Sequence, residues 1–280
     1  MDQSLSFNRA LVEKYDRPGP RYTSYPTAPQ FHQAFAMDDY HAAAQASNQA
    51  AVPKALSLYI HIPFCKSLCY YCACNKIITQ KTHRAVEYLN YLKREIAMQA
   101  ALFDRTRTLR QLHLGGGTPT YLTREQLAEL MDCLHQASNL HDSDEHAVSS
   151  DGDPRPRRTE QIEHLRQLGF NRLSFGVQDF DPDVQAAVNR LQSEEQIYAL
   201  VAAAREAKFK SVSVDLIYGL PLQTVASFDV TLSKIIALRP DRIAAYSYAH
   251  LPELPRAQRL LRREHTPPPE RTLELLEPTA

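Results

Sequence analysis

Short apolar runs alternate with amphipathic stretches along most of this sequence, and this alternation restricts the possible folds more than its other features. The runs that we interpret as buried strands are 56–62, 109–114, 146–150, 171–177, 211–220 and 242–251. Helices are predicted between them, with caps at Thr123, Thr159 and Ser193. The helix over 86–96 is expected to have Val86, Leu89, Leu92 and Ile96 on one face. Repeated strand–helix units imply a parallel sheet with helices outside. They predict an α/β fold, an open partial (β/α)6 barrel with functional residues at the C-terminal ends of its strands.

The segments on either side of the alternation have a different character. Residues 1–50 are irregular to weakly helical, and the three prolines within 19–29 predict extended or turning chain. We therefore assign 1–50 to an N-terminal arm and 51–280 to the barrel. Residues 265–280 resemble a Pro-rich turn followed by the start of an amphipathic helix, so we expect a barrel that is incomplete at its C-terminus.

Composition excludes several classes of function. The chain has 32 basic and 32 acidic residues, so no global field attracts it to nucleic acid or to an anionic membrane. No apolar run is long enough to span a bilayer, and the N-terminus lacks the apolar stretch of a signal peptide. We expect a cytoplasmic protein that binds neither nucleic acid nor membrane.

Four of the five cysteines lie within ten positions, in the segment CKSLCYYCAC (65–74). An odd count without a signal peptide argues against a disulfide framework and fits a reducing compartment. Cys65, Cys69 and Cys72 form a C-x3-C-x2-C motif just after the first predicted strand. Three thiolates can ligate three irons of a [4Fe–4S] cluster. The fourth iron is then open to the amine and carboxylate of S-adenosylmethionine (SAM).

Two other interpretations of the cysteines remain open. A four-thiolate zinc site would add Cys74 to the three cysteines of the motif. The crowded C-x-C at 72–74 disfavours it, as does the lack of a second, separated pair of ligands. Unrelated core thiols are the other interpretation, and the short aromatic-rich loop makes it the weakest. Cys133 lies on a predicted helical face, where we expect it to contribute packing.

The segment YIHIPFCKSLCYYCACNKI (59–77) resembles the cluster loop of the oxygen-independent coproporphyrinogen III oxidases, a radical SAM family of haem biosynthesis. GPRYTSYPT (19–27) resembles the N-terminal arm of that family. Further similar segments follow in the same order: LHLGGGTPTYL, GFNRLSFGVQDF, VNR (188–190), VDLIYGLP and YAHLP (248–252). The resemblance covers nearly all of residues 10–275, and Cys74 and the arm favour the oxidases over the related haem chaperones.

The resemblance implies contacts with two SAM molecules and assigns no catalytic side chain. Tyr59 would contact the SAM bound to the cluster, and Asp151 takes the place of a family glutamate there. The glycine-rich SAM-binding turn corresponds to Gly116, Gly117 and Thr118. The second SAM would contact Tyr71, Gln178, Arg190, Asp215 and Ala249. Structural alternatives are a simple tight turn for the glycines, a turn cap for Asp215 and a surface charge for Arg190. Gln178 and Asp215 are expected at strand ends, where an amide and a carboxylate can hold a ribose or an ammonium group.

The implied activity is oxidative decarboxylation of coproporphyrinogen III to protoporphyrinogen IX in anaerobic haem biosynthesis. A 5′-deoxyadenosyl radical abstracts hydrogen from the β-carbon of a propionate, and loss of CO2 and one electron leaves a vinyl group. The implied partners are the porphyrinogen and a reductive electron donor resembling flavodoxin or ferredoxin, and a monomer is expected. Arg21 in the arm is a candidate for binding a substrate carboxylate bidentately, or else a surface arginine.

The chain departs from the family pattern at three places. It ends where the family continues for a domain-sized stretch that covers the substrate and completes the first SAM site, so we expect a missing C-terminal domain. Asp151 is one methylene shorter than the glutamate, and Gly152 replaces an apolar residue. Pro156 should disturb the start of the next helix. These departures predict impaired turnover. The alternative function is a non-catalytic protein that binds haem, a cluster or SAM through a retained fold.

Overall fold

The computed structural model describes residues 7–15, 26–140, 145–155, 159–251, 253 and 256–277. Arg21 and Pro156 lie outside the described residues, as does most of the segment 19–29.

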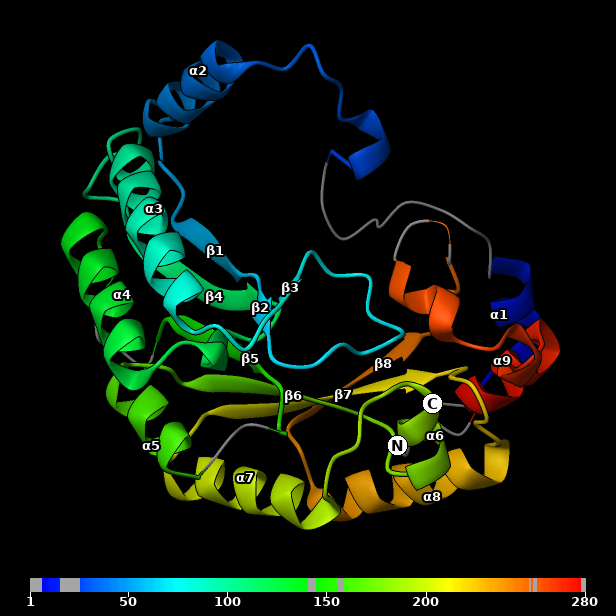
Figure 1. Cartoon of the computed structure of the whole chain (residues 1–280). Helices are drawn as coiled ribbons and strands as arrows, with labels where there is room; N and C mark the ends of the chain where they lie inside the picture. Colours follow the sequence, from blue (N-terminus) through cyan, green and yellow to red (C-terminus); the bar gives the residue numbers. More distant parts are fainter. Residues whose placement is uncertain are drawn as a thin grey trace, which may run out of the picture.

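Six parallel strands form one curved sheet with helices on its outer side (Figure 1). They lie in the order β1-β4-β5-β6-β7-β8, and each pair of neighbours is parallel. Their bounds are β1 Leu56–Ile62, β4 Leu109–Gly116, β5 Ala147–Gly152, β6 Arg172–Gln178, β7 Ser211–Tyr218 and β8 Arg242–Ser247. The sheet order follows the chain order, as in a barrel built from successive strand–helix units. The predicted α/β fold and partial (β/α)6 barrel are confirmed.

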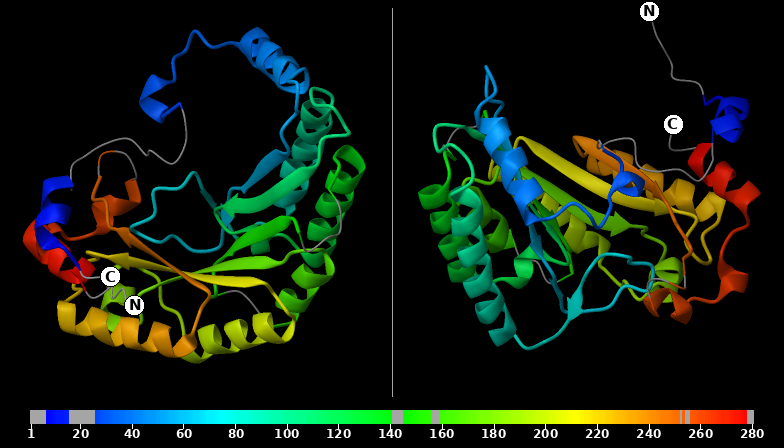
Figure 2. Two further views of the ribbon diagram at one scale, coloured as in Figure 1. Left: turned by 180° about the vertical axis from the view of Figure 1, so that it is seen from behind. Right: turned by 90° about the horizontal axis from the view of Figure 1, so that it is seen from above.

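The helices that follow these strands cover the outside of the sheet (Figures 1 and 2). They are α3 His83–Ala100, α4 Arg124–Ala137, α5 Thr159–Gln167, α7 Glu194–Glu206, α8 Val225–Leu238 and α9 Pro269–Leu276. The other described elements are α1 Arg9–Tyr15, α2 Met37–Asn48, α6 Pro182–Ala187, β2 Phe64–Cys65, β3 Ile77–Ile78, and the 3-10 turns η1 Ala28–Gln30, η2 Pro119–Tyr121, η3 Arg256–Leu260 and η4 Arg263–His265. Helix α9 contacts β7 and α8, and its Leu275 is fully buried, so a last helix does pack on this barrel.

Helix caps follow the sequence at two of the three predicted positions. The Thr123 hydroxyl accepts a hydrogen bond from the Gln126 amide at 3.2 Å, and the Gln126 side chain accepts one from the Thr123 amide at 3.0 Å. The Ser193 hydroxyl accepts a bond from the Gln196 amide at 3.3 Å. Thr159 instead lies inside α5 as its first residue, so its predicted capping role is wrong. The two confirmed caps satisfy amides that the first turn of a helix leaves unpaired.

The buried face of α3 differs from the prediction at one position. Ala85, Leu89, Leu92 and Ile96 are buried, whereas Val86, which we expected on that face, is 51% exposed. The intervals of four, three and four residues keep the first four on a single stripe of the helix. Val86 is about 100° away from Ala85 around the axis, since an α-helix has 3.6 residues per turn.

Alternation along the strands decides which side chains face the inside of the barrel. In β7, Val212 and Val214 are fully buried in the core between sheet and helices, and Asp215 faces the other way. Asp215 lies in the middle of β7, so the expectation that it ends a strand is wrong. The strand continues because Tyr218 still pairs with Ser247 of β8. Gln178 does end β6, as expected.

Part of the predicted arm packs on the edge of the barrel. The Tyr40 hydroxyl of α2 donates to the Gln99 side chain of α3 at 2.5 Å. The Arg107 guanidinium donates to Ser47 and Asn48 at 2.8 Å each. The assignment of 1–50 to an arm and 51–280 to a barrel stays a prediction. Among the described residues, no helix combines the length and apolarity that crossing a membrane requires.

Candidate cluster and cofactor site

The cysteine motif lies in the loop between β1 and α3. Cys65 is in β2, which pairs with β3, and the Thr79 amide donates to the Cys65 carbonyl at 3.0 Å. This pairing closes the base of the loop, so Cys69 and Cys72 lie in its outer part. The loop extends from β1 across the open end of the sheet towards β8 (Figure 1).

Two distant segments hold the outer part of the loop. The Tyr70 amide donates to the Val188 carbonyl at 3.0 Å, and the Asn189 side chain donates to the Leu68 carbonyl at 2.7 Å. On the other side, the Gln258 side-chain nitrogen donates to the carbonyls of Tyr71 and Ala249 at 3.0 Å each. Gln258 is 1% exposed.

Gln258 therefore joins the cluster loop to the segment after β8. Gln258 was not among the residues predicted from the sequence. A single glutamine in the charged segment 256–265 carries no signal that would have identified it.

Each thiol of the motif has a different polar environment. Thr118 Oγ1 donates to Cys65 Sγ at 3.6 Å, although burial raises the pKa of the Cys65 thiol. Arg155 Nη2 and Arg190 Nη1 donate to Cys69 Sγ at 3.2 and 3.3 Å.

Cys72 and Cys74 share a hydrogen bond. This bond lowers the pKa of Cys72 to about 5 and raises the pKa of Cys74. The charge of the Lys76 ammonium group and its hydrogen bond to the thiol also lower the pKa of Cys72, and the same ammonium group donates to the Cys72 carbonyl at 2.6 Å. Cys74 is exposed and acts here as a hydrogen-bond partner of Cys72.

These residues fit a [4Fe–4S] cluster. Cluster ligands are thiolates, and the lowered pKa of Cys72 favours that form. Cys65 and Cys69 accept hydrogen bonds on sulfur, as ligands of a cluster commonly do. Among the residues that the structure describes, no three His, Cys, Asp or Glu side chains converge to hold a metal ion. Three cluster thiolates bind three different irons and need no such convergence, whereas a zinc ion requires it. The ligand set stays a prediction, and so does the choice between a cluster and the four-thiolate zinc alternative.

The glycine-rich turn after β4 packs against the start of the cluster loop. The Gly117 amide donates to the Ile62 carbonyl and the Thr118 amide to the Phe64 carbonyl, at 2.8 Å each. A Cβ on Gly117 would lie 2.7 Å from the Pro63 carbonyl oxygen. Gly116 has φ +111°, a conformation that favours glycine. The tight-turn interpretation thus explains both glycines, and their contact with SAM stays a prediction.

Inward-facing side chains of β1, β4 and β5 form a polar row beside this turn. The ring of Tyr59 stacks on His113, with centroids 5.7 Å apart, and its hydroxyl hydrogen-bonds with His61 Nδ1 at 3.0 Å. His113 Nε2 lies 3.3 Å from Asp151 Oδ2, and His113 Nδ1 lies 2.7 Å from Ser149 Oγ. The hydrogen bond with Asp151 raises the pKa of His113. The two predicted contacts of the first SAM, Tyr59 and Asp151, are thus brought together by His113.

His113 was also not among the residues predicted from the sequence. The only signal that could have identified it is its position in the alternation of β4, two residues before the glycines.

The predicted contacts of the second SAM gather around Gly176. A Cβ on this glycine would lie 2.7 Å from Gln178 Nε2 and 2.9 Å from Arg190 Nη2. Gln178 Oε1 and Arg190 Nε are buried and have no hydrogen-bond partner among the residues that the structure describes. Arg190 is 6% exposed, so the surface-charge alternative is wrong. An unpaired acceptor and an unpaired donor, buried side by side, fit a polar ligand.

Of the other three predicted contacts, Tyr71 and Asp215 interact with the charge of Arg190. Burial raises the pKa of Tyr71 well above its usual value, and the Arg190 charge opposes that rise. Ala249 is joined to Tyr71 through Gln258. The Asp215 carboxylate accepts a hydrogen bond from Ser174 Oγ at 3.0 Å, so it does not cap the following turn.

The radical SAM superfamily profile matches residues 59–235, which include the cluster loop and the strands from β1 to β7. This chain belongs to the radical SAM superfamily. Its similarity to individual members extends along the whole chain. It is 47% identical over 279 residues to the oxygen-independent coproporphyrinogen III oxidase of Pseudomonas aeruginosa, covering 100% of this chain and 60% of that protein. The enzyme of the same name from Escherichia coli is 46% identical over 280 residues, covering 99% and 59%.

A solved structure agrees with these relatives. The E. coli coproporphyrinogen III oxidase, described as a radical SAM enzyme, superposes with a TM-score of 0.89 at 45% identity, covering 99% of this chain and 61% of that one. The chain thus spans about three fifths of the length of the curated relatives that it matches. The predicted resemblance is confirmed, and membership of the superfamily implies a [4Fe–4S] cluster and SAM.

Asp215 should reveal the energetic cost of keeping a carboxyl group inside the barrel. Burial raises the pKa of Asp215 from about 3.8 to about 6, with Ser174 opposing the shift. Folding stability is therefore lost as pH rises through this window, because the unfolded chain releases the proton first. We expect Asp215→Asn to increase the free energy of unfolding at pH 7 by up to about 3 kcal/mol, and to change it little below pH ~4. Urea denaturation across this pH range measures the effect.

The matched control for this variant is Asp132→Asn, since Asp132 is exposed on α4. It should change the free energy of unfolding little at either pH. Two results would contradict the prediction that the buried Asp215 carboxylate destabilises the fold. One is a gain in the free energy of unfolding of Asp215→Asn that does not depend on pH, and the other is a loss of that free energy at pH 7.

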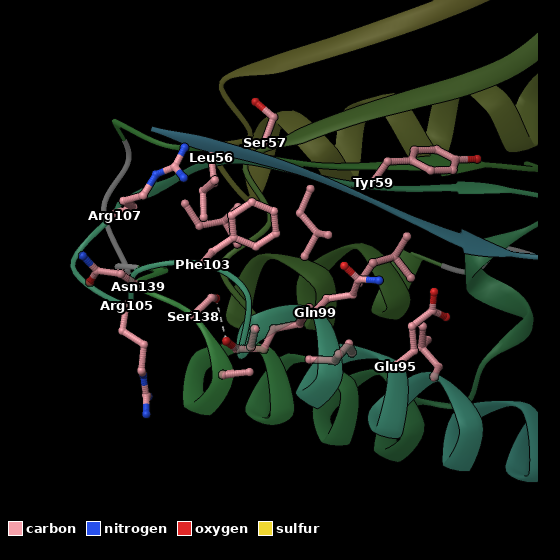
Figure 3. Close-up of a pocket in the computed structure, with 18 of the residues that line it drawn as sticks. Leu56, Ser57, Tyr59, Glu95, Gln99, Phe103, Arg105, Arg107, Ser138 and Asn139 are labelled. Carbon is pink, nitrogen blue, oxygen red and sulfur yellow. Dashed lines mark hydrogen bonds between the residues drawn. The ribbon is translucent and has the colours of Figure 1, made fainter. Parts of the chain in front are cut away.

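A cavity of about 290 Å³ lies between β1 and α3, away from the cysteines (Figure 3). Its lining is largely apolar, with Leu56 and Phe103 among the residues drawn, and Arg105 and Arg107 lie near its margin. Of the predicted cofactor residues, Tyr59 alone lines it. A second cavity of about 290 Å³ adjoins the cluster loop, and Lys66, Thr118 and Arg155 line it. Only the second cavity lies beside the residues that contact the thiols of the motif.

Proposed function

We propose that this chain forms the barrel of an oxygen-independent coproporphyrinogen III oxidase, which converts coproporphyrinogen III to protoporphyrinogen IX in anaerobic haem biosynthesis. The observation that carries the proposal is the similarity to relatives of that name, in sequence and in fold, along 99% of the chain. The arrangement of the loop thiols beside two groups of polar residues supports it.

The cofactor assignments follow from the site. Cys65, Cys69 and Cys72 would hold the cluster, and its open iron would bind one SAM. When bound, the two groups supply a 5′-deoxyadenosyl radical that abstracts hydrogen. Tyr59 and Asp151 line the first SAM position, with Asp151 oriented by His113, and the turn of Gly116, Gly117 and Thr118 lies beside them.

A second SAM would lie against the group around Gly176. Its residues are Tyr71, Gln178, Arg190, Asp215 and Ala249. The unpaired Gln178 Oε1 can accept a hydrogen bond from a ribose hydroxyl or an ammonium group. The unpaired Arg190 Nε can donate one to a carboxylate.

The overall reaction balances for each propionate. One C–H bond and the bond to the carboxylate carbon break, and a C=C bond forms with release of CO2 and two electrons. SAM is the net oxidant, since it takes up these electrons and a proton and ends as methionine and 5′-deoxyadenosine. Two such events give the two vinyl groups.

The remaining assignments concern the protein's surroundings. A low-potential electron carrier of the flavodoxin or ferredoxin type would supply the initiating electron. The five cysteines are unbridged and fit a reducing cytoplasm, and we propose that the protein acts as a monomer.

The proposal is tested by anaerobic reconstitution with iron and sulfide, followed by incubation with SAM, dithionite and coproporphyrinogen III. We expect 5′-deoxyadenosine and a product that carries vinyl groups. The matched control is the same mixture with a porphyrinogen that lacks propionates, which should give no vinyl product.

Each alternative predicts a different outcome. A chain that holds a cluster and never cleaves SAM would be a binding protein that retains the fold. Cleavage of SAM without decarboxylation would overturn the proposed substrate. One zinc per chain without sulfide would overturn the cluster itself.

A further inference from the structure

The thiol of Cys69 accepts hydrogen bonds from a buried charged network of two arginines and one aspartate. Arg155 follows β5 and Arg190 precedes α7, yet their guanidinium groups donate to the same sulfur at 3.2 and 3.3 Å. Their side chains are 17% and 8% exposed. The sulfur of Cys65 accepts a hydrogen bond from the neutral Thr118 hydroxyl, and the Cys72 thiol has the single ammonium group of Lys76 beside it, whereas Cys69 accepts from two guanidinium groups.

Asp153 holds the two arginines in place. Arg155 donates to both carboxylate oxygens, with Nε at 3.0 Å from Oδ1 and Nη2 at 2.6 Å from Oδ2. Arg190 Nη2 lies 3.6 Å from Oδ1. Burial tends to raise the pKa of Asp153, but the two guanidinium groups lower it below its usual value. The network therefore contains two cations and one anion, a net charge of +1 beside Cys69.

A net positive charge at this position has a defined effect on an iron–sulfur cluster. Reduction adds one negative charge to the cluster and its thiolates. A buried cation is weakly screened and stabilises that added charge. Hydrogen bonds to ligand sulfur atoms act in the same direction, because they withdraw electron density from the thiolate. Both effects favour the reduced cluster.

We propose that Arg155 and Arg190 raise the reduction potential of the cluster through Cys69, and that Asp153 limits this rise by neutralising one of the two cations. The inference deepens the proposed function and rests on the cluster being held by Cys65, Cys69 and Cys72. The network of Arg155, Arg190 and Asp153 would adjust how readily an electron carrier can reduce the cluster. Arg155 and Arg190 contact a proposed ligand of the cluster, and Asp153 positions these two arginines.

The test is a redox titration of the reconstituted chain, monitored by electron paramagnetic resonance without SAM or porphyrinogen. Arg155→Gln should decrease the equilibrium constant for one-electron reduction at least tenfold, which is ~59 mV. Asp153→Asn should change the potential in the opposite direction, because it removes the anion and leaves an acceptor for Arg155. Arg155→Lys should lower the potential less than Arg155→Gln, since an ammonium group keeps the charge.

The matched control is Arg205→Gln. Arg205 forms an exposed ion pair with Asp241 at 3.8 Å on the outside of the barrel, and its loss should leave the potential unchanged. If Arg155→Gln does not retain a cluster by iron and sulfide analysis, Asp153→Asn and Arg155→Lys still decide the question. Equal potentials in these variants and the unmodified chain, or shifts of the same sign in Arg155→Gln and Asp153→Asn, would overturn the proposal.

The two proposals fail separately. A chain that holds the cluster but does not decarboxylate porphyrinogen refutes the proposed function and leaves the assignment of the network intact. An active enzyme whose potential is insensitive to Asp153 and Arg155 refutes the network alone.

Discussion

Replacing Cys69 with serine should leave the reconstituted chain without its iron–sulfur cluster. Cys69 is the central cysteine of the motif, is buried, and accepts hydrogen bonds on its sulfur from two guanidinium groups. A serine hydroxyl stays protonated at neutral pH and cannot replace the thiolate as an iron ligand. Iron and acid-labile sulfide per chain measure the loss, which we expect to be nearly complete.

Two other cysteines provide the matched controls. Cys133 lies on α4 and packs against the core, so Cys133→Ser should retain the cluster. Cys74→Ser should also retain it, because Cys74 is an exposed partner of Cys72. Loss of the cluster in Cys74→Ser combined with its retention in Cys69→Ser would show that the ligand set is wrong.

The second large effect is expected at Gly117. A Cβ at this position would lie 2.7 Å from the Pro63 carbonyl oxygen and 2.8 Å from that of Phe64. Both atoms belong to the backbone that leads into the cluster loop, and Phe64 lies in β2. Relieving the contact would therefore require a shift of β2. We expect Gly117→Ala to lower the free energy of unfolding by about 1–3 kcal/mol, as overpacking does in a well-packed region. Chemical denaturation of the chain measures this loss.

Gly115→Ala is the matched control for the same turn. Its added Cβ would meet side-chain atoms of Tyr59 at 2.8 Å and of Asp151 at 3.1 Å, and side chains can move more readily than backbone. We expect it to cost less than Gly117→Ala. If the two variants lost equal stability, the close approach of the two backbones would not be the reason for glycine at 117. Cluster content should also fall in Gly117→Ala, because the carbonyls that it displaces lie just before Cys65.

Much of the fold could be predicted because its signals are local. The strand at 56–62 has the predicted bounds, since a run of alternating residues between turns sets its own limits. The capping box of Thr123 and Gln126 involves residues three positions apart. The wrong prediction for Val86 is also local. Neighbouring residues of a helix face different directions, and Ala85, one position earlier, is the apolar residue that is buried. Asp215 lies in the middle of β7 because the pairing of β7 with β8 continues as far as Tyr218. The extent of that pairing cannot be deduced from the local sequence around Asp215.

The residues of the candidate site also fall into two groups, those that local sequence patterns predicted and those that they did not. The three cysteines of the motif are within eight positions, and the glycines lie together after β4, so both were found from the sequence. His113, Gln258 and the pair of Asp153 and Arg155 were missed. The aspartate at 151 attracted attention because it stands in for a glutamate, but the aspartate two residues later forms the ion pairs beside Cys69.

By itself, the sequence determined that strands and helices alternate and that a cysteine-rich loop follows the first strand. Both signals, the apolar periodicity and the cysteine spacing, involve residues that are only a few positions apart in the chain. Only the tertiary structure decided that Arg155 and Arg190 meet at Cys69, 86 and 121 residues away along the chain. The curvature of the parallel sheet and its register bring the ends of β1, β5 and β6 around one loop. Contacts over such separations depend on the packing of the whole barrel, and the burial of a charge becomes defined only when that packing is complete.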